Sequence, residues 1–360
     1  MKKNKKIKAF ILKLLTNKRN TLFDIKKSKS VLVLKYDRIG DMVVSTPIFR
    51  ELKLAYPNIK ISVLASKENK DVIKNNPYID KIYTNYKNQI FNDLPTLLNL
   101  RRKNFDVCIE LEHSVIPHAI FRLIIINPKK ILTIHKDGRY GVEGSNLKLY
   151  DYFTKKNTKN HFGKIWLETL VFFGIKPSSY DYDFFLGSIE KEKAKKFVIS
   201  LGKKIKIGIN TEGSFPEKSI QIKELEKICI GLYKNFSNIK IVILTQPEKL
   251  LEKEKLILDL GLDYVVTSYR TESIIDAAAL IEQLDLIITP DTSIVHIASA
   301  FNKPIVSIHE NNKDSFRLWS PASTLSKTIF SSSSYGLVGY SVDDIIESTC
   351  EFLKIIELDI

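Results

Sequence analysis

Short runs of aliphatic, β-branched residues alternate with segments of helical periodicity from residue 31 onward, and this rhythm constrains the fold more than any other feature. Residues 31–34 have the length and composition of a buried strand. A turn through residues 36–40 follows, then a helical stretch over about 41–55, and residues 59–64 form the next strand. Strand, helix and strand in that order make a βαβ unit, whose right-handed crossover implies parallel pairing. The sequence therefore predicts an α/β fold with doubly wound parallel sheets.

The same rhythm occurs in two series. Further strands are expected at 107–111 and 130–134 in the first series, and at 205–209, 239–244, 264–266, 286–289 and 304–308 in the second. Helical patterns fall between the later strands, around 221–235, 248–260, 271–283 and 292–301. A chain of 360 residues is long for one core and suits two. We expect a segment 1–29, domains over 30–185 and 186–330, and a linker with a final helix over 331–360.

The amino-terminal segment carries most of the net charge. Residues 1–29 hold eleven Lys and Arg against Asp24 alone, so they contribute +10 of the net +15. Apolar residues recur at helical spacing among these lysines: Ile7, Phe10, Ile11, Leu14 and Leu15. A basic amphipathic helix of this kind suits an anionic membrane surface; a solvated tail of lysines is the alternative. Because the remaining residues are only mildly basic, no nucleic-acid partner is expected.

Neither a signal peptide nor a membrane span is predicted. Lys13 interrupts the apolar stretch, and no small-residue cleavage site follows it. No run of eighteen apolar residues occurs in the sequence. We therefore expect a cytoplasmic protein, attached peripherally to the inner face of the inner membrane if the amino-terminal helix forms.

Two loops that follow predicted strands contain candidate catalytic or ligand-binding residues. Gly40 permits a sharp turn, and Asp41 opens a helix, where a carboxylate is either a functional group or a simple helix cap. In residues 210–218, Gly213 and Ser214 can bring backbone N–H groups close to a ligand, and Lys218 supplies a point charge for a phosphate. An exposed, solvated loop is the alternative for that segment.

The third loop, residues 286–300, passes from a buried strand directly into a helix. Asp291 or Thr292 can cap this helix, and the N–H groups of its first turn, which includes Ser293, make an anion site suited to a diphosphate. His296 shares a face with Thr292 because the two are four residues apart. This spacing favours contact of His296 with a ligand over a purely structural role.

Together these loops resemble those of the heptosyltransferase family, family 9 of the bacterial glycosyltransferases. Residues 38–47 (Arg-Ile-Gly-Asp-Met-Val-Val-Ser-Thr-Pro) match its amino-terminal Gly-Asp loop and following Pro step. Residues 291–298 match its Asp-Thr-Gly-x-x-His helix, with Lys303-Pro304 after it. The resemblance runs in order and spacing over most of residues 31–322.

What the resemblance implies is a GT-B fold, in which two Rossmann-like domains face a cleft, and inverting, metal-independent sugar transfer without a cofactor. It makes 30–185 the acceptor domain and 186–330 the nucleotide-sugar donor domain. Asp41 matches the catalytic base of the family, and Lys218 matches a lysine that contacts donor phosphate. Asp291, Thr292 and His296 match positions that bind the nucleotide diphosphate, with Ser214 and Ser293 beside them. We expect the acceptor near His113 and residues 136–145, with Arg38, Lys136 and Arg139 as candidates for pairing with its phosphates or carboxylates.

The family default is heptose transfer from ADP-heptose to a lipopolysaccharide or related surface-glycan acceptor. Three departures bear on the donor: Ser293 replaces the usual Gly, Ser219-Ile220 replaces Arg/His-Trp, and His309-Glu310 stands where Phe-Gly is usual. Three alternatives therefore stay open: transfer of another nucleotide sugar in capsule or O-antigen synthesis, a nucleotide-sugar epimerase, and a non-catalytic membrane-attached scaffold.

Overall fold

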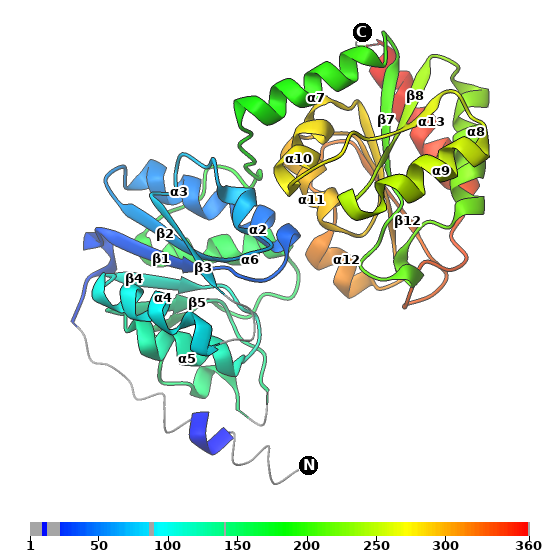
Figure 1. Ribbon diagram of the computed structural model, residues 1–360. Coiled ribbons are helices and arrows are strands. Elements are labelled where there is room, and N and C mark those ends of the chain that lie inside the picture. Colours follow the sequence, from blue (N-terminus) through cyan, green and yellow to red (C-terminus); the bar gives the residue numbers. More distant parts are fainter. Residues whose placement is uncertain (1–8, 13–21, 86–89, 140–141, 359–360) are drawn as a thin grey trace. The chain divides into compact units, whose positions relative to one another are not determined.

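The computed structural model describes residues 9–12, 22–85, 90–139 and 142–358, and the chain divides into two compact units. Unit 1 is Met1–Asp183 and unit 2 is Phe184–Ile360. Each unit contains one six-stranded parallel sheet with helices on both faces (Figure 1). The predicted doubly wound α/β fold is confirmed.

The sheet of unit 1 has the order β3-β2-β1-β4-β5-β6. Its strands are β1 (Ser30–Leu34), β2 (Lys60–Ser66), β3 (Lys81–Asn85), β4 (Val107–Glu110), β5 (Lys130–Thr133) and β6 (Tyr152–Phe153). Helices α2 (Ile39–Ser45), α3 (Pro47–Ala55) and α6 (Phe162–Leu167) cover one face, and α4 (Ile90–Arg102) and α5 (Pro117–Ile126) cover the other (Figure 1).

The sheet of unit 2 has the order β12-β11-β10-β7-β8-β9. Its strands are β7 (Ile205–Asn210), β8 (Ile239–Leu244), β9 (Val265–Thr267), β10 (Leu286–Pro290), β11 (Ile305–His309) and β12 (Ser326–Phe330). Its helices are α7 (Ser188–Ser200), α8 (Ile222–Asn235), α9 (Leu250–Leu260), α10 (Ile274–Gln283), α11 (Ser293–Ala300), α12 (Lys313–Trp319) and α13 (Val342–Leu358). Numbered from its own first strand, each sheet has the Rossmann order 3-2-1-4-5-6.

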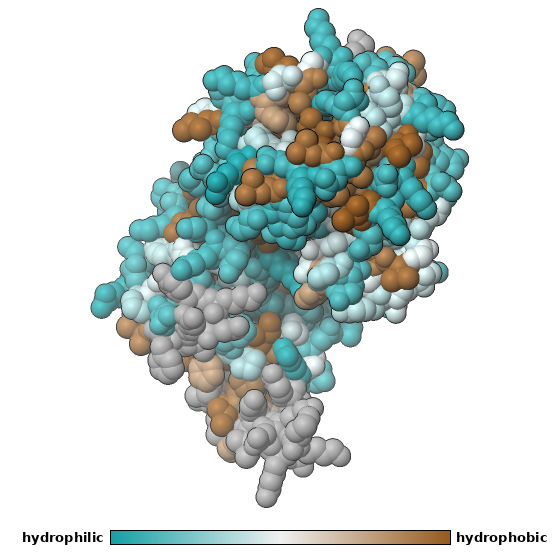
Figure 2. All heavy atoms as spheres, turned by 45° about the vertical axis from the view of Figure 1, so that its right-hand side comes forward, coloured by the Kyte–Doolittle hydropathy of each residue, from teal (hydrophilic) through white to brown (hydrophobic). Residues whose placement is uncertain are grey.

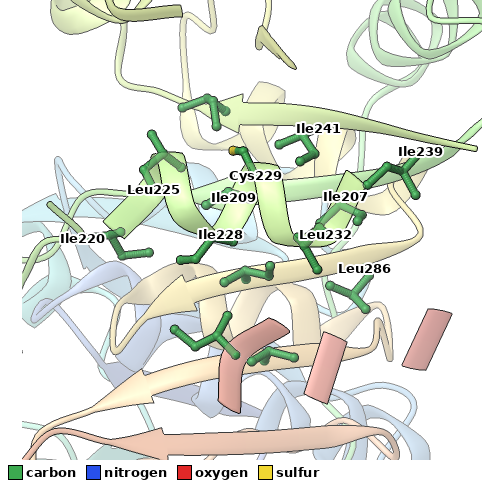
Figure 3. Close-up of a cluster of buried hydrophobic side chains, with 14 of the residues drawn as sticks. Ile207, Ile209, Ile220, Leu225, Ile228, Cys229, Leu232, Ile239, Ile241 and Leu286 are labelled. Carbon is green, nitrogen blue, oxygen red and sulfur yellow. The ribbon is translucent and has the colours of Figure 1, made fainter. Parts of the chain in front are cut away.

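The core of unit 2 explains why the aliphatic runs are strands. Leu225, Ile228 and Leu232 lie on one stripe of α8, three or four residues apart, and are buried against Ile207 and Ile241 of the sheet (Figure 3). Helix α13 packs beside α8 over the same face. Burying both faces of a parallel sheet favours strands that are largely apolar, as observed in β8, where Lys240 is the exception, and in β10, where it is Thr289.

The structure differs from the sequence predictions in its helices and in its edge strands. The single helix expected over 41–55 is two helices, α2 and α3, separated at Thr46, because Pro47 has no N–H to donate back into a continuous helix. Strands β3, β6 and β12 were not predicted. All three are at or next to sheet edges and are partly exposed, so they lack the continuous apolar run of a buried strand.

The serine-rich segment after β12, predicted as a flexible link, is hydrogen bonded in place. The Ser331 N–H donates to the carbonyl of His309, and the Ser332 N–H donates to that of Val338. Beyond it, α13 forms part of the core of unit 2. On the face of the molecule in Figure 2, apolar side chains lie interspersed with hydrophilic ones.

Only a short part of the predicted amphipathic helix lies within the described residues. Residues 9–12 are helical; Leu12 is buried in the core of unit 1, whereas Phe10 and Ile11 are exposed. Ile7, Leu14 and Leu15 fall outside the described residues. None of the helices in the described part of the chain is long and apolar enough to cross a membrane.

Candidate active site

The strand order identifies where a ligand should bind in each unit. In a doubly wound sheet, ligands bind beyond the carboxyl ends of the strands at the point where the strand order reverses. In unit 1 this point lies between β1 and β4, and in unit 2 it lies between β7 and β10. The Asp41 loop follows β1, and the loops of Lys218 and Thr292 follow β7 and β10. All three predicted loops therefore lie at switch points.

In unit 1 a buried lysine joins two carboxylates. Lys35 directly follows β1, and its side chain is 2% exposed. Its Nζ donates to Asp37 Oδ2 at 2.6 Å and to Asp41 Oδ1 at 3.4 Å, and lies 4.0 Å from the centre of the Trp166 ring. The side chains of Asp37 and Asp41 are 24% and 17% exposed. Two carboxylates thus reach solvent above one buried ammonium.

Asp41 is not a helix cap. Helix α2 begins at Ile39, and the capping position is occupied by Arg38, whose side chain makes no capping hydrogen bond. Asp41 lies in the first turn of α2, where the helix dipole favours its negative charge. The capping explanation of the Gly-Asp pair is therefore wrong, and the carboxylate of Asp41 is directed to Lys35.

Burial and charge set different pKa values for the three acidic groups of this cluster. Burial, with the neighbouring Asp37 charge, raises the pKa of Asp41, and Lys35 only partly offsets this. Although burial opposes it, Lys35 and a hydrogen bond from Glu112 lower the pKa of Asp37. Burial, the hydrogen bond to Asp37 and the charge of Asp37 raise the pKa of Glu112 to about 9. Glu112 is therefore protonated and Asp37 ionised at neutral pH.

A second charged layer lies beneath this cluster at the ends of β4 and β5. The fully buried Glu110 forms an ion pair with Lys136 and accepts a hydrogen bond from Thr133 Oγ1 at 3.1 Å. The Nζ of Lys136 also donates to the Glu112 carbonyl at 2.5 Å. These bonds fix the backbone of the segment that carries Glu112. Lys136, expected from the sequence as a contact for the acceptor, is instead buried and paired with Glu110. The sequence does not indicate this pairing, because the two residues are far apart in the chain.

The candidate acceptor residues occupy different positions in unit 1. Arg38 is exposed beside Asp41. His113 is also exposed, with its ring 5.5 Å from that of Phe162 and close enough to feel the charge of Lys35. Arg139 is exposed in the loop after β5, and its charge acts on His118. Arg38 and His113 thus adjoin the Lys35 cluster.

In unit 2 the side chain of Asn210 links the carboxyl ends of β7 and β10, the two strands at the switch point. Asn210 ends β7, and its Nδ2 donates to Thr289 Oγ1 at 3.0 Å and to Thr292 Oγ1 at 3.2 Å. Thr292 is the N-cap of α11 and accepts a hydrogen bond from the Ile294 N–H at 3.3 Å. Ser293 is half-buried in the first turn. The start of α11 is thereby held at the carboxyl end of β7.

Lys218 lies in the loop after β7 and is paired with Glu310, the residue that directly follows β11. Its Nζ donates to Glu310 Oε2 at 2.6 Å, and Glu310 Oε1 accepts from the Gly336 N–H at 2.6 Å. The loop is tight: a Cβ on Gly213 would lie 2.1 Å from the Lys218 carbonyl oxygen. Ser214 is exposed at its tip.

Two histidines adjoin the α11 start. His296 is buried within α11, with its ring 5.8 Å from that of Trp319. His309 ends β11, and its Nδ1 lies 3.8 Å from Asp291 Oδ2. Burial lowers the pKa of His309, and Asp291 opposes this change. Among the described residues, no group of three or more His, Cys, Asp or Glu is arranged to hold a metal ion.

Comparison with known proteins identifies the family. Residues 98–335 match the family model described as glycosyltransferase family 9 (heptosyltransferase). The chain belongs to glycosyltransferase family 9. Its enzyme class is therefore glycosyltransferase, and the family resemblance stated from the loop motifs is confirmed.

Individual proteins that are similar to this chain cover most of it. A candidate lipopolysaccharide heptosyltransferase 4 of Escherichia coli K12 is 25% identical over 310 residues, covering 84% of this chain and 81% of its own. A family 9 glycosyltransferase from Veillonella parvula has a TM-score of 0.76 at 16% identity, covering 92% of this chain and 99% of its own. The Escherichia coli heptosyltransferase WaaC, solved with ADP, has a TM-score of 0.68 at 15% identity, with 90% and 99% covered. The two structural likenesses show that this chain has the GT-B fold of the family.

Proposed function

We propose that this family 9 chain is an inverting, metal-independent transferase that moves heptose from ADP-heptose to a lipopolysaccharide core acceptor. The observation that carries the proposal is the Asp41 carboxylate, which is solvent-reaching, has a raised pKa and lies at the switch point of unit 1. A carboxylate of raised pKa is a better general base than an ordinary aspartate. The names of the heptosyltransferase relatives, and the presence of ADP in the WaaC structure, support the choice of donor and acceptor.

In the proposed mechanism, Asp41 accepts the proton of an acceptor hydroxyl as its oxygen attacks the anomeric carbon and inverts it. Arg38 and His113, beside the Lys35 cluster, orient acceptor phosphate or carboxylate groups. Arg139 lies further along the same unit and contacts a more distant part of the acceptor.

The donor contacts belong to unit 2. The first turn of α11, with Thr292 and Ser293, and the ammonium of Lys218 stabilise the charge that develops on the departing diphosphate. Asp291 and His296 position the α11 start, and Ser214 contributes its backbone N–H from the adjacent loop. The departures from the family pattern at Ser293 and His309-Glu310 lie in this region, so they favour a different nucleotide sugar as the second candidate donor.

Calorimetry against ADP, UDP, GDP and CMP, first with a chelator and then with Mg²⁺, tests the donor. We expect metal-independent selection of ADP that is lost in Lys218→Ala and in Thr292→Ala. Selection of another nucleotide would keep the transferase and replace the ADP-heptose. Failure of all four to bind would overturn the donor site and favour the scaffold alternative.

Product analysis tests the reaction. With ADP-heptose and a lipopolysaccharide-core oligosaccharide, wild-type protein should release ADP only when the oligosaccharide is present, whereas an epimerase needs no acceptor. Asp41→Asn should lower kcat by about 10²-fold or more, since a general base contributes roughly 10²–10⁴-fold. Turnover within a few-fold of wild type would show that Asp41 is not the base.

The amino-terminal segment attaches the enzyme to the membrane that holds its acceptor, on the cytoplasmic face. Leu12 anchors the helical turn 9–12 to unit 1 while Phe10 and Ile11 are 63% and 44% exposed, amid eleven basic residues in 1–29. Exposed apolar groups among lysines suit an anionic interface. The protein should co-sediment with phosphatidylglycerol vesicles and not with phosphatidylcholine vesicles. Phe10→Ser/Ile11→Ser should weaken this binding; equal binding to both vesicles would contradict the assignment.

A further inference from the structure

The ammonium of Lys35 is shared unequally between two carboxylates. It lies 2.6 Å from Asp37 Oδ2 and 3.4 Å from Asp41 Oδ1. The lysine side chain is 2% exposed and its Nζ faces the Trp166 ring, so water cannot replace either carboxylate as its partner. The closer carboxylate therefore takes most of the lysine charge.

We propose that Asp37 is a positioning residue for the transfer reaction, which holds Lys35 away from Asp41 and so keeps Asp41 a strong base. The proposal rests on the proposed role of Asp41 as general base. It assigns to Asp37 no contact with donor or acceptor. Asp37 acts through Lys35, by geometry and by charge.

The surroundings of Asp41 support this division of roles. The neighbours of Asp41 are Lys35, which follows β1, and Asp37 and Arg38 in the next loop. Glu112, which follows β4, also belongs to this cluster. Lys35 and Arg38 lower the pKa of Asp41, whereas burial and Asp37 raise it. Asp37 is thus the charged neighbour among these that opposes the two cations.

Glu112 keeps Asp37 in place from the other side. Its protonated carboxyl, at a pKa of about 9, is hydrogen bonded to Asp37, and its backbone is fixed by Lys136. Exposed His113 follows it and feels the charges of both Lys35 and Asp37. When two carboxyls have environments that drive their pKa values apart, each can serve a different role. Here the ionised Asp37 binds the lysine and Asp41 is left to accept protons.

Asp37→Asn tests the inference without any substrate. Asparagine keeps the shape of the side chain and removes its charge, so Lys35 turns to Asp41. In protein labelled with ¹³C at the aspartate carboxyl, the Asp41 signal, assigned with Asp41→Asn, should titrate at lower pH in Asp37→Asn than in wild type. Asp80→Asn is the matched control, because Asp80 also pairs with lysines in unit 1, Lys53 and Lys60, and its loss should leave the Asp41 titration unchanged.

An Asp41 titration that stays in place or moves to higher pH in Asp37→Asn would overturn the inference. Kinetics with ADP-heptose distinguish failure of this inference from failure of the proposed function. Asp37→Asn should shift the acid limb of kcat/KM to lower pH and reduce its plateau, by less than the roughly 10²-fold loss expected for Asp41→Asn. If Asp41→Asn stays active, the proposed function fails. If Asp41→Asn is inactive but the acid limb of kcat/KM in Asp37→Asn lies at the same pH as in wild type, the inference alone fails.

Discussion

Replacing Glu310 by glutamine should strengthen nucleotide binding, although Glu310 contacts the proposed phosphate-binding lysine. Lys218 and Glu310 are 2.6 Å apart, and their side chains are 23% and 18% exposed. A diphosphate that reaches Lys218 must give up part of this ion pair. A partly exposed pair is worth up to about 1 kcal/mol, which corresponds to roughly fivefold in affinity. Glutamine can still accept the hydrogen bond from the Gly336 N–H, so the loop it holds should keep its position.

Calorimetry with ADP in the presence of a chelator measures this effect, with an expected Kd about fivefold lower for Glu310→Gln. Glu217→Gln is the matched control: Glu217 adjoins Lys218 in the chain and is exposed, so its replacement makes the same change in net charge without touching the ion pair. If Glu310→Gln binds ADP more weakly than wild type, the carboxylate assists the donor site and the reasoning is wrong. An equal gain in both variants would show a general effect of net charge.

Three further predictions concern other parts of the structure. Asp93→Asn removes the carboxylate that lies 2.7 Å from the buried Arg122 and should destabilise unit 1 by about 3 kcal/mol. Urea titrations followed by Trp166 fluorescence, in a Trp319→Phe background, measure this loss, and a loss below about 1 kcal/mol would contradict the prediction. Burial and Asp37 raise the pKa of Glu112 from 4.5 to about 9, so between pH 4.5 and about 9 the folded protein keeps a proton that the unfolded chain releases, and the free energy of unfolding falls as the pH rises. Glu112→Gln should make the free energy of unfolding less dependent on pH in this range, and an unchanged pH dependence would refute the prediction. Thr292→Ala removes the cap of α11 at a cost of about 1 kcal/mol and should weaken ADP binding, whereas unchanged affinity would place the diphosphate elsewhere.

The sequence determined the strands that lie inside the sheets. Strand β8 has the predicted bounds, 239–244, and β7 and β10 differ from prediction by one residue at one end. These strands are buried on both faces, so most of their residues are aliphatic and the run is visible locally. Strand β6, by contrast, has only two residues at a sheet edge, and its conformation depends on pairing with β5.

The sequence also located the three loops, since a βα rhythm places the end of every strand at one edge of a parallel sheet. Which side chains meet there was decided by the tertiary structure. Lys218 and Glu310 are 92 residues apart and come together because β7 and β11 flank β10. Glu112 reaches Asp37 because β4 pairs with β1 rather than with β3, the strand that precedes β4 in the sequence. Local periodicity encodes which residues are buried, but strand order and register fix which charges become partners, and these follow only from packing the whole sheet.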